Sequence, residues 1–230
     1  MSVPRLSIIV PIYNEERTIA VVIDKLHEIF STDTEIIFVD DGSADRSLAI
    51  VEEKARPSDI VLTKENGGKG SAVRLGLTKT SAPFTVIQDA DLEYDPAEIR
   101  TLLRSAEEHP GTIVFGSRFL QKNPNIYKRN YIGNRLITAI LDILFLGTLT
   151  DSYTCYKLFP TAILRSFPLT AQSFELEAEL SAWPLKRGIP IREVPIRYAP
   201  RSHEEGKKIR AKDAWKGLLT MLRIRFARSS

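Results

Sequence analysis

Two aspartates one residue apart, Asp89 and Asp91, are the residues of this chain whose types and spacing most directly suggest chemistry. They follow an apolar run at residues 84–87 that is typical of a buried strand, so both carboxylates lie where that strand passes into a loop. Two carboxylates in this position can share one hard divalent cation and, through the cation, hold a diphosphate. An ordinary polar loop explains the pair equally well, because surface loops are rich in aspartate.

The elements that must position these acids alternate along the first half of the chain. Strands are expected at residues 6–12, 35–39, 60–62, 84–88 and 112–115, with helical segments between them. Repeated strand–helix units favour an α/β fold with a mostly parallel sheet flanked by helices and ligands at the carboxyl ends of the strands. Further on, we expect a polar loop at 121–130, helices at 134–145 and 173–186, an edge strand at 189–198 and a final helix at 211–228.

Four strand ends carry polar residues that a parallel sheet brings to one edge. They are Asn14 and Glu15, Asp40 and Asp41, Asp89 and Asp91, and Ser117 and Arg118. Acids gathered at one edge repel one another unless a cation is bound, which favours a metal-assisted site over independent loop acids.

Two common phosphate-binding signatures are absent from the sequence. No Gly-x-x-x-x-Gly-Lys-Ser/Thr occurs, and Tyr13-Asn14-Glu15 occupies the turn where a Rossmann chain has its glycines. The glycine-rich turn at 67–70 is either a flexible helix start or a turn from which Lys69 reaches a phosphate. Nucleotide recognition is therefore expected to depend on side chains and metal.

In order and spacing, these segments resemble glycosyltransferase family 2 with the A-type nucleotide-sugar-binding (Rossmann-like) fold, and within it the polyprenyl-phosphate (dolichyl-phosphate) mannose and glucose synthases. The matching residues are Pro11-Ile12-Tyr13-Asn14-Glu15, Val39-Asp40-Asp41-Gly42-Ser43, Gly68-Lys69-Gly70, Asp89-Ala90-Asp91 and Gly116-Ser117-Arg118. We expect one catalytic domain over 1–230, with a nucleotide-sugar-binding half at about 1–118, an acceptor-binding half at about 119–210 and a C-terminal amphipathic helix at about 211–228.

The resemblance implies roles for individual residues. The donor contacts it implies are Pro11, Tyr13, Glu15, Asp41, Lys69, Asp89, Ala90 and Asp91. Mg²⁺ or Mn²⁺ would be held by Asp89 and Asp91, with Glu93 as a third ligand where related synthases carry glutamine. The acceptor-phosphate contacts it implies are Arg118, Arg129, Arg201 and Lys208, and the catalytic residues are Asp89, Asp91 and Arg118. For each of the four cations, a solvated surface charge is the competing interpretation.

The implied reaction is inverting transfer of a hexose, mannose or glucose, from a GDP- or UDP-linked donor to polyprenyl or dolichyl phosphate. A phosphate monoester has a second pKa of about 6 and is largely a dianion near neutral pH, so it needs no strong base. A hydroxyl acceptor needs one, and Asp151 and Glu175 are the candidates. Capping of a helix explains Asp151 as well, and Glu175, Glu177 and Glu179 also fit an ordinary helix start.

Other functions stay open at this point. A soluble glycan or another lipid could be the acceptor, and a metal-dependent nucleotidyltransferase would use the same paired acids. Nucleic-acid binding is disfavoured, because the basic residues are not interleaved with aromatic platforms and the acidic edge would repel phosphate.

Charge and apolar patterning suggest a membrane surface as a partner. Residues 197–230 carry ten Lys or Arg against three Asp or Glu, a net charge of +7 in a chain whose total is +3. In the last helix an apolar stripe is flanked by basic residues, which fits an anionic bilayer surface or docking on the domain. The stripe consists of Trp215, Leu219, Leu222 and Phe226, and the basic residues are Lys212, Lys216, Arg223 and Arg225.

The expected location is cytoplasmic, with peripheral attachment to the membrane. The chain has one cysteine, Cys155, and no signal-peptide pattern at its N-terminus. Its longest apolar stretch, 136–149, is interrupted by polar residues and falls short of the ~20 residues that span a bilayer.

Overall fold

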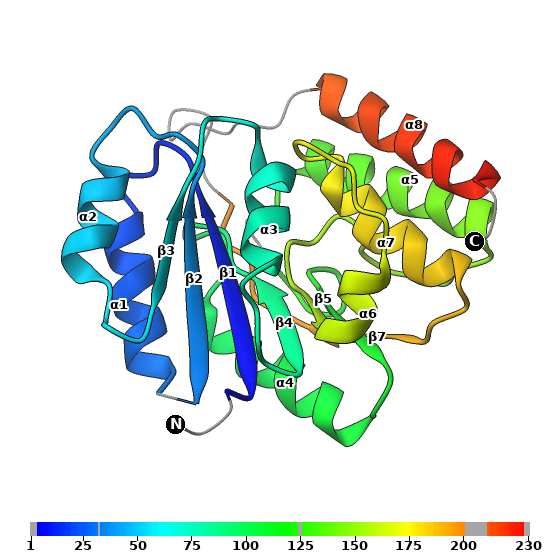
Figure 1. Cartoon of the computed structure of the whole chain (residues 1–230). Helices are drawn as coiled ribbons and strands as arrows, with labels where there is room; N and C mark the ends of the chain where they lie inside the picture. Colours follow the sequence, from blue (N-terminus) through cyan, green and yellow to red (C-terminus); the bar gives the residue numbers. More distant parts are fainter. Residues whose placement is uncertain (1–3, 32, 124–125, 201–210, 228–230) are drawn as a thin grey trace.

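A seven-stranded sheet forms the centre of the computed structural model, which describes residues 4–31, 33–123, 126–200 and 211–227 (Figure 1). The strands are β1 (Leu6–Ile12), β2 (Thr34–Asp40), β3 (Ile60–Thr63), β4 (Phe84–Ile87), β5 (Ile113–Ser117), β6 (Lys157–Pro160) and β7 (Ile191–Pro195). Their order in the sheet is β3-β2-β1-β4-β6-β5-β7. Strand β6 pairs antiparallel with both neighbours, and the other pairings of described strands are parallel. The mostly parallel α/β sheet expected from the sequence is confirmed.

Helices flank this sheet. They are α1 (Ile19–Ile29), α2 (Ser47–Lys54), α3 (Lys69–Leu77), the short 3₁₀ helix η1 (Pro96–Glu98), α4 (Ile99–Glu108), α5 (Lys128–Phe145), α6 (Thr161–Ser166), α7 (Leu176–Lys186) and α8 (Ala211–Phe226). Among the described residues, no helix combines the length and apolar character needed to cross a membrane.

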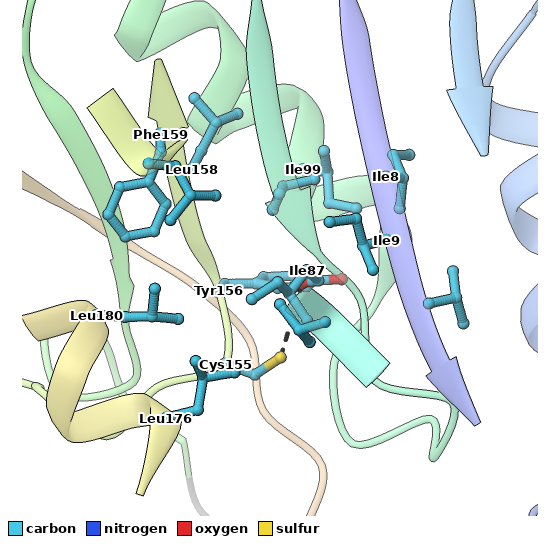
Figure 2. Packing of buried hydrophobic residues seen from close by; sticks show 14 of the residues in the cluster. Ile8, Ile9, Ile87, Ile99, Cys155, Tyr156, Leu158, Phe159, Leu176 and Leu180 are labelled. Atoms are coloured by element: carbon cyan, nitrogen blue, oxygen red, sulfur yellow. Dashed lines mark hydrogen bonds between the residues drawn. The ribbon is translucent and has the colours of Figure 1, made fainter. Parts of the chain in front are cut away.

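The core explains why the central strands are almost continuously apolar. Strand β1 lies between two neighbours and is covered by helices, so both of its faces are buried. Figure 2 shows Ile9 of β1 near Ile87 of β4, while Phe159 of β6 and Leu180 of α7 lie on the other side of β4 in the same buried cluster. This packing fixes the strand ends that carry the polar residues.

The second half of the chain departs from the sequence expectation in three places. Strand β6 and helix α6 were not predicted, and β6 separates β4 from β5 in the sheet. Helix α5 begins at Lys128, so part of the expected polar loop at 121–130 is helical, and α7 begins at Leu176 instead of residue 173. Strand β7 lies at the sheet edge, as its prolines predicted.

Candidate active site

The carboxyl ends of β1, β2 and β4 meet at one edge of the sheet. Ile12 at the end of β1 lies beside Asp40 at the end of β2, and β4 pairs with β1 on its other side. The loops that follow these strands therefore come together, as the sequence predicted.

Hydrogen bonds join the first of these loops to the Asp-Ala-Asp segment. The hydroxyl of Thr18 lies 3.0 Å from Oε2 of Glu15 and 2.7 Å from the carbonyl oxygen of Ala90. Pro11 is half-buried and Tyr13 is 39% exposed, so the Tyr13 ring is accessible to a ligand. Ala90 is buried and contributes to this junction through its backbone.

Asp41 holds the glycine-rich turn against the end of β2. Its carboxylate accepts hydrogen bonds from the backbone N–H groups of Gly67 (3.0 Å) and Gly68 (2.7 Å) and pairs with Lys64 (2.6 Å). Gly68 has a φ of 87°, which favours glycine, and a Cβ there would lie 2.5 Å from a backbone oxygen. The sequence placed the neighbouring Asp40 at this strand end without giving it a role of its own, and its Oδ1 is buried without a hydrogen-bond partner in the described part of the chain.

Lys69, the first residue of α3, lies between two acids. Its Nζ is 2.8 Å from Oδ1 of Asp89 and 3.0 Å from Oε1 of Glu177 in α7. The other oxygen of Glu177 pairs with Lys157 of β6, which also donates to the carbonyl oxygen of Thr154 at 2.6 Å. Four charges of alternating sign thus run inward from the site, and the side chain of Lys157 is fully buried.

Burial and pairing act in opposite directions on these groups. Burial favours the neutral form of Glu177, but Lys157 and Lys69 overcome it and lower the pKa of the Glu177 carboxyl to about 2. Burial lowers the pKa of Lys69, but Asp89 and Glu177 raise that pKa well above its ordinary value. Cys155, which Figure 2 shows beside Ile87 at the end of β4, is a buried thiol whose pKa is raised by burial.

Of the three glutamates near the start of α7, Glu177 is the one that faces this site. Glu175 accepts hydrogen bonds from backbone N–H groups that precede the helix. Glu179 accepts from Thr170 and pairs with Arg223 of α8 at 2.6 Å. The sequence did not distinguish between the three.

The three predicted metal ligands differ in their surroundings. The backbone N–H of Glu93 donates to Oδ1 of Asp91 at 3.1 Å, and the hydroxyl of Tyr198 donates to Oε2 of Glu93 at 2.8 Å. In the described ranges, no three His, Cys, Asp or Glu side chains converge in a way that could hold a metal ion. Asp89 and Asp91 remain suitable donors for Mg²⁺ or Mn²⁺, because both ions take carboxylate oxygens. Leu92, which follows them, has a φ of 61°, a strained conformation that is common at ligand sites.

Arg118, at the end of β5, forms a buried ion pair with Asp151. Its Nε and Nη2 donate to the two carboxylate oxygens at 2.7 and 2.8 Å, and its guanidinium lies 5.1 Å from the centre of the Tyr198 ring. The pKa of Arg118 is raised despite burial, because Asp151 stabilises the charged form. Asp151 is completely buried in this pair, which explains the residue better than helix capping or a role as a general base.

Two neighbouring cavities lie next to the segment that follows Arg118, and both are lined by Gln121 and Asn123. The smaller, of about 190 Å³, is lined by Arg118, Phe119, Gln121, Asn123, Ile126, Lys128 and Tyr131. The larger, of about 420 Å³, is lined by Lys25, Leu92, Glu93, Asp95, Gln121, Lys122, Asn123, Arg197, Tyr198 and Ala199. Arg201, Lys208 and the side chain of Arg129 lie outside the described residues. Lys128, which sequence reasoning did not single out, is a cation of the smaller cavity.

Helix α8 docks on the domain through a different face from the stripe seen in the sequence. Thr220, Met221 and Ile224 are buried against the domain, and Lys186 of α7 donates to two carbonyl oxygens at the end of α8, each at 2.6 Å. Three members of the predicted stripe face outward: Trp215 is 62% exposed, Leu219 48% and Phe226 79%. The sequence left open whether this stripe meets a bilayer surface or packs on the domain. Packing on the domain is wrong for these three side chains.

Helix α5, which lies beside α8 in Figure 1, carries a second exposed apolar stripe. Its members are Ile132, Leu136 and Ile143, continued by Leu146 just after the helix, with Tyr127 just before the helix and Tyr131 in its first turn. Ile132 is 64% exposed and Ile143 77%, which is unusual for large apolar side chains on neighbouring helices.

Comparison with known proteins gives a family and a fold. A family model described as Glycosyl transferase family 2 matches residues 7–167. Glycosyltransferase AglJ of Haloferax volcanii is 30% identical over 197 residues, which cover 84% of this chain and 63% of that protein. An undecaprenyl-phosphate 4-deoxy-4-formamido-L-arabinose transferase of Edwardsiella ictaluri is 27% identical over 221 residues, covering 88% and 62%.

Among solved structures, glucosyl-3-phosphoglycerate synthase from Mycobacterium tuberculosis, in complex with Mn²⁺, uridine diphosphate and phosphoglyceric acid, superposes with a TM-score of 0.76. It is 22% identical, and the match covers 99% of this chain and 80% of that one. The likeness confirms the expected A-type nucleotide-sugar-binding fold.

Proposed function

The chain belongs to glycosyltransferase family 2, and we propose that it transfers a hexose, mannose or glucose, from a GDP- or UDP-linked donor to polyprenyl phosphate at the cytoplasmic membrane surface. It spans less than two thirds of the length of the two curated relatives described above, 63% and 62%. One of these relatives is named for transfer to undecaprenyl phosphate.

The observation that carries the proposal is a cationic cavity that opens beside an apolar helix surface. Arg118 and Lys128 line the smaller cavity, and Tyr131 both lines it and begins the exposed stripe that continues to Ile132 and Leu136. An acceptor with an anionic head and a long apolar tail needs this combination, because the head requires cations and the tail requires apolar contact.

In this proposal the donor occupies the edge formed by β1, β2 and β4. Asp89 and Asp91 hold Mg²⁺ or Mn²⁺, and when bound the metal neutralises charge that builds on the departing diphosphate. Tyr13 and Glu15 meet the nucleoside from the first loop, while Asp41 keeps the glycine-rich turn in place beside it. The manganese and uridine diphosphate in the mycobacterial structure support this arrangement by analogy of fold.

The acceptor end of the site favours a phosphate over a hydroxyl. A phosphate dianion attacks the anomeric carbon without a general base, from the face opposite the diphosphate, and the sugar inverts. A hydroxyl would need a base, but Asp151 is paired with Arg118 and Glu175 is bonded to backbone N–H groups. Arg118 and Lys128 supply the positive charge that brings two anions together.

The direct test is incubation of the protein with radiolabelled GDP- and UDP-sugars, Mn²⁺ and isolated polyprenyl phosphate. We expect label in the organic phase, its loss in Asp91→Asn, and its retention in Asp95→Asn, which removes an acid four residues along the same loop. Label that appears only in a water-soluble product would point to a soluble glycan or a small phosphorylated acceptor. Release of pyrophosphate without sugar transfer would point to nucleotidyl transfer, and full activity of Asp91→Asn would refute the metal assignment.

A further inference from the structure

Asp89, Lys69, Glu177 and Lys157 form a series of four paired charges in which Lys69 has two acidic partners. Lys69 is shared between Asp89, which is partly open to solvent, and Glu177, which is nearly buried: their side chains are 21% and 8% exposed. Glu177 is in turn kept in place by the fully buried Lys157. This series of charges therefore has a buried inner end at Lys157 and an accessible outer end at Asp89.

The backbone on either side of Lys69 is held firmly. The N–H of Ser71 donates to the carbonyl oxygen of Gln172 at 3.1 Å. Any Cβ at Gly68 or Gly70 would lie only 2.5 or 2.4 Å from a backbone oxygen of the segment before α7. The glycines thus let this turn pack closely against the segment before α7, and in the proposal below the movement of the ammonium group comes from the flexible Lys69 side chain.

We propose that Lys69 is an exchangeable counter-ion of Asp89 and that Glu177 is the positioning residue that makes the exchange possible. Without metal, Lys69 neutralises Asp89. When a divalent cation takes Asp89, Lys69 releases it and turns to the donor's diphosphate, and it keeps Glu177 as its second partner throughout. The inference rests on the function proposed above, because it requires a metal and a nucleoside diphosphate at this edge.

The physical reason is the cost of an unpaired buried charge. If Asp89 were the only acidic partner of Lys69, binding of a metal to Asp89 would leave the buried ammonium group of Lys69 unpaired, which is strongly unfavourable. Lys69 would then compete strongly with the metal for Asp89. A second carboxylate removes that penalty. Metal binding and diphosphate binding are thereby coupled, since both favour the same position of Lys69.

The test measures Mn²⁺ binding by electron paramagnetic resonance without nucleotide, so it does not depend on turnover. Lys69→Met removes the competing cation and should tighten Mn²⁺ binding by roughly fivefold or more, the lower range of measured couplings between sites. The same variant should bind GDP or UDP more weakly, because the diphosphate loses a cation. Glu177→Gln leaves Asp89 as the one carboxylate paired with Lys69 among the described residues and should weaken Mn²⁺ binding by a similar factor.

A matched control separates direct competition from a general effect of charge. Lys64→Met also removes one lysine at this edge, but that lysine pairs with Asp41 and not with Asp89. The proposal is overturned if Lys64→Met tightens Mn²⁺ binding as much as Lys69→Met, or if Lys69→Met has no effect. Should Glu177→Gln fail to fold, the comparison of the two lysine variants still decides the matter. If the wild-type protein binds no Mn²⁺ even with a nucleoside diphosphate, the metal assignment of the proposed function fails as well.

Discussion

The outward apolar face of α8 should determine how strongly the protein binds a membrane. Trp215 and Phe226 are large, exposed and on the face opposite the one that docks on the domain. Replacing both with serine in a double variant removes apolar surface without touching Met221 or Ile224, which hold the helix in place. The fold should therefore survive while membrane affinity falls.

The size of the effect follows from the exposed fractions. Fully burying a large apolar side chain contributes roughly 1.5–3 kcal/mol. Because Trp215 is 62% and Phe226 79% exposed, moving them from water into the bilayer interface recovers about 1–2 kcal/mol each. The double variant should lose about 2–4 kcal/mol, and at 1.4 kcal/mol per factor of ten this is a decrease of roughly 30-fold or more in vesicle affinity.

Co-sedimentation with vesicles of mixed zwitterionic and anionic phospholipid measures the affinity. Val21→Ser is the matched control, because Val21 is an exposed apolar residue, 44% accessible, on α1 and away from α5 and α8. The control should bind as the wild type does. Equal binding by the double variant and the wild type, or no binding by either, would refute the assignment of this surface to the membrane.

Three further variants test the packing and charges behind the site. Asp151→Asn leaves the buried guanidinium of Arg118 without its carboxylate and should lower the free energy of unfolding by about 3–5 kcal/mol in urea titrations; wild-type stability would contradict the pairing. The carboxyl of Glu177 has a folded pKa of about 2 against 4.5 when unperturbed, so its contribution to stability is complete above about pH 4.5 and is lost as the pH falls towards 2. Glu177→Gln should therefore flatten the dependence of stability on pH in that window, and an unchanged slope would contradict the shift. Gly217→Ala places a Cβ 1.8 Å from a tyrosine hydroxyl under α8 and should lower the melting temperature, whereas Gly133→Ala on α5 meets nothing within 4 Å and should not.

Local patterns were enough to predict the strands of the first half of the chain and the meeting of their ends. The apolar runs of β1, β2 and β4 are long or distinct enough to indicate buried strands, and parallel pairing then brings their loops to one edge. Strand β6 escaped prediction because it is four residues long, begins with Lys157 and ends with a proline. The charge of its buried lysine is compensated by Glu177, twenty residues further along the chain.

The charge pairs of the site could not have been found in the same way. Lys69 and Glu177 are 108 residues apart, and Arg118 and Asp151 are 33 apart, so no local pattern links them. The C-terminal helix shows a related limit. Its sequence contains an apolar stripe, but Met221 and Ile224 form a second apolar face, and only the packing shows which face is covered.

The pairs also change how the acidic edge should be interpreted. The sequence predicts that acids gathered at strand ends favour a metal-assisted site, but three cations of the chain pair with acids of this region. Lys64 pairs with Asp41, Lys69 with Asp89 and Arg118 with Asp151. Two of the strand-end acids, Asp41 and Asp89, are thus neutralised by lysines of the chain itself, so the closeness of these acids does not by itself argue for a metal. A metal is favoured at Asp89 because the lysine paired with it, Lys69, has Glu177 as a second acidic partner and can release Asp89. Asp41, in contrast, also accepts hydrogen bonds from two backbone N–H groups, and Asp151 is completely buried. Of these three acids, Asp89 is therefore the one able to exchange its partner for a ligand.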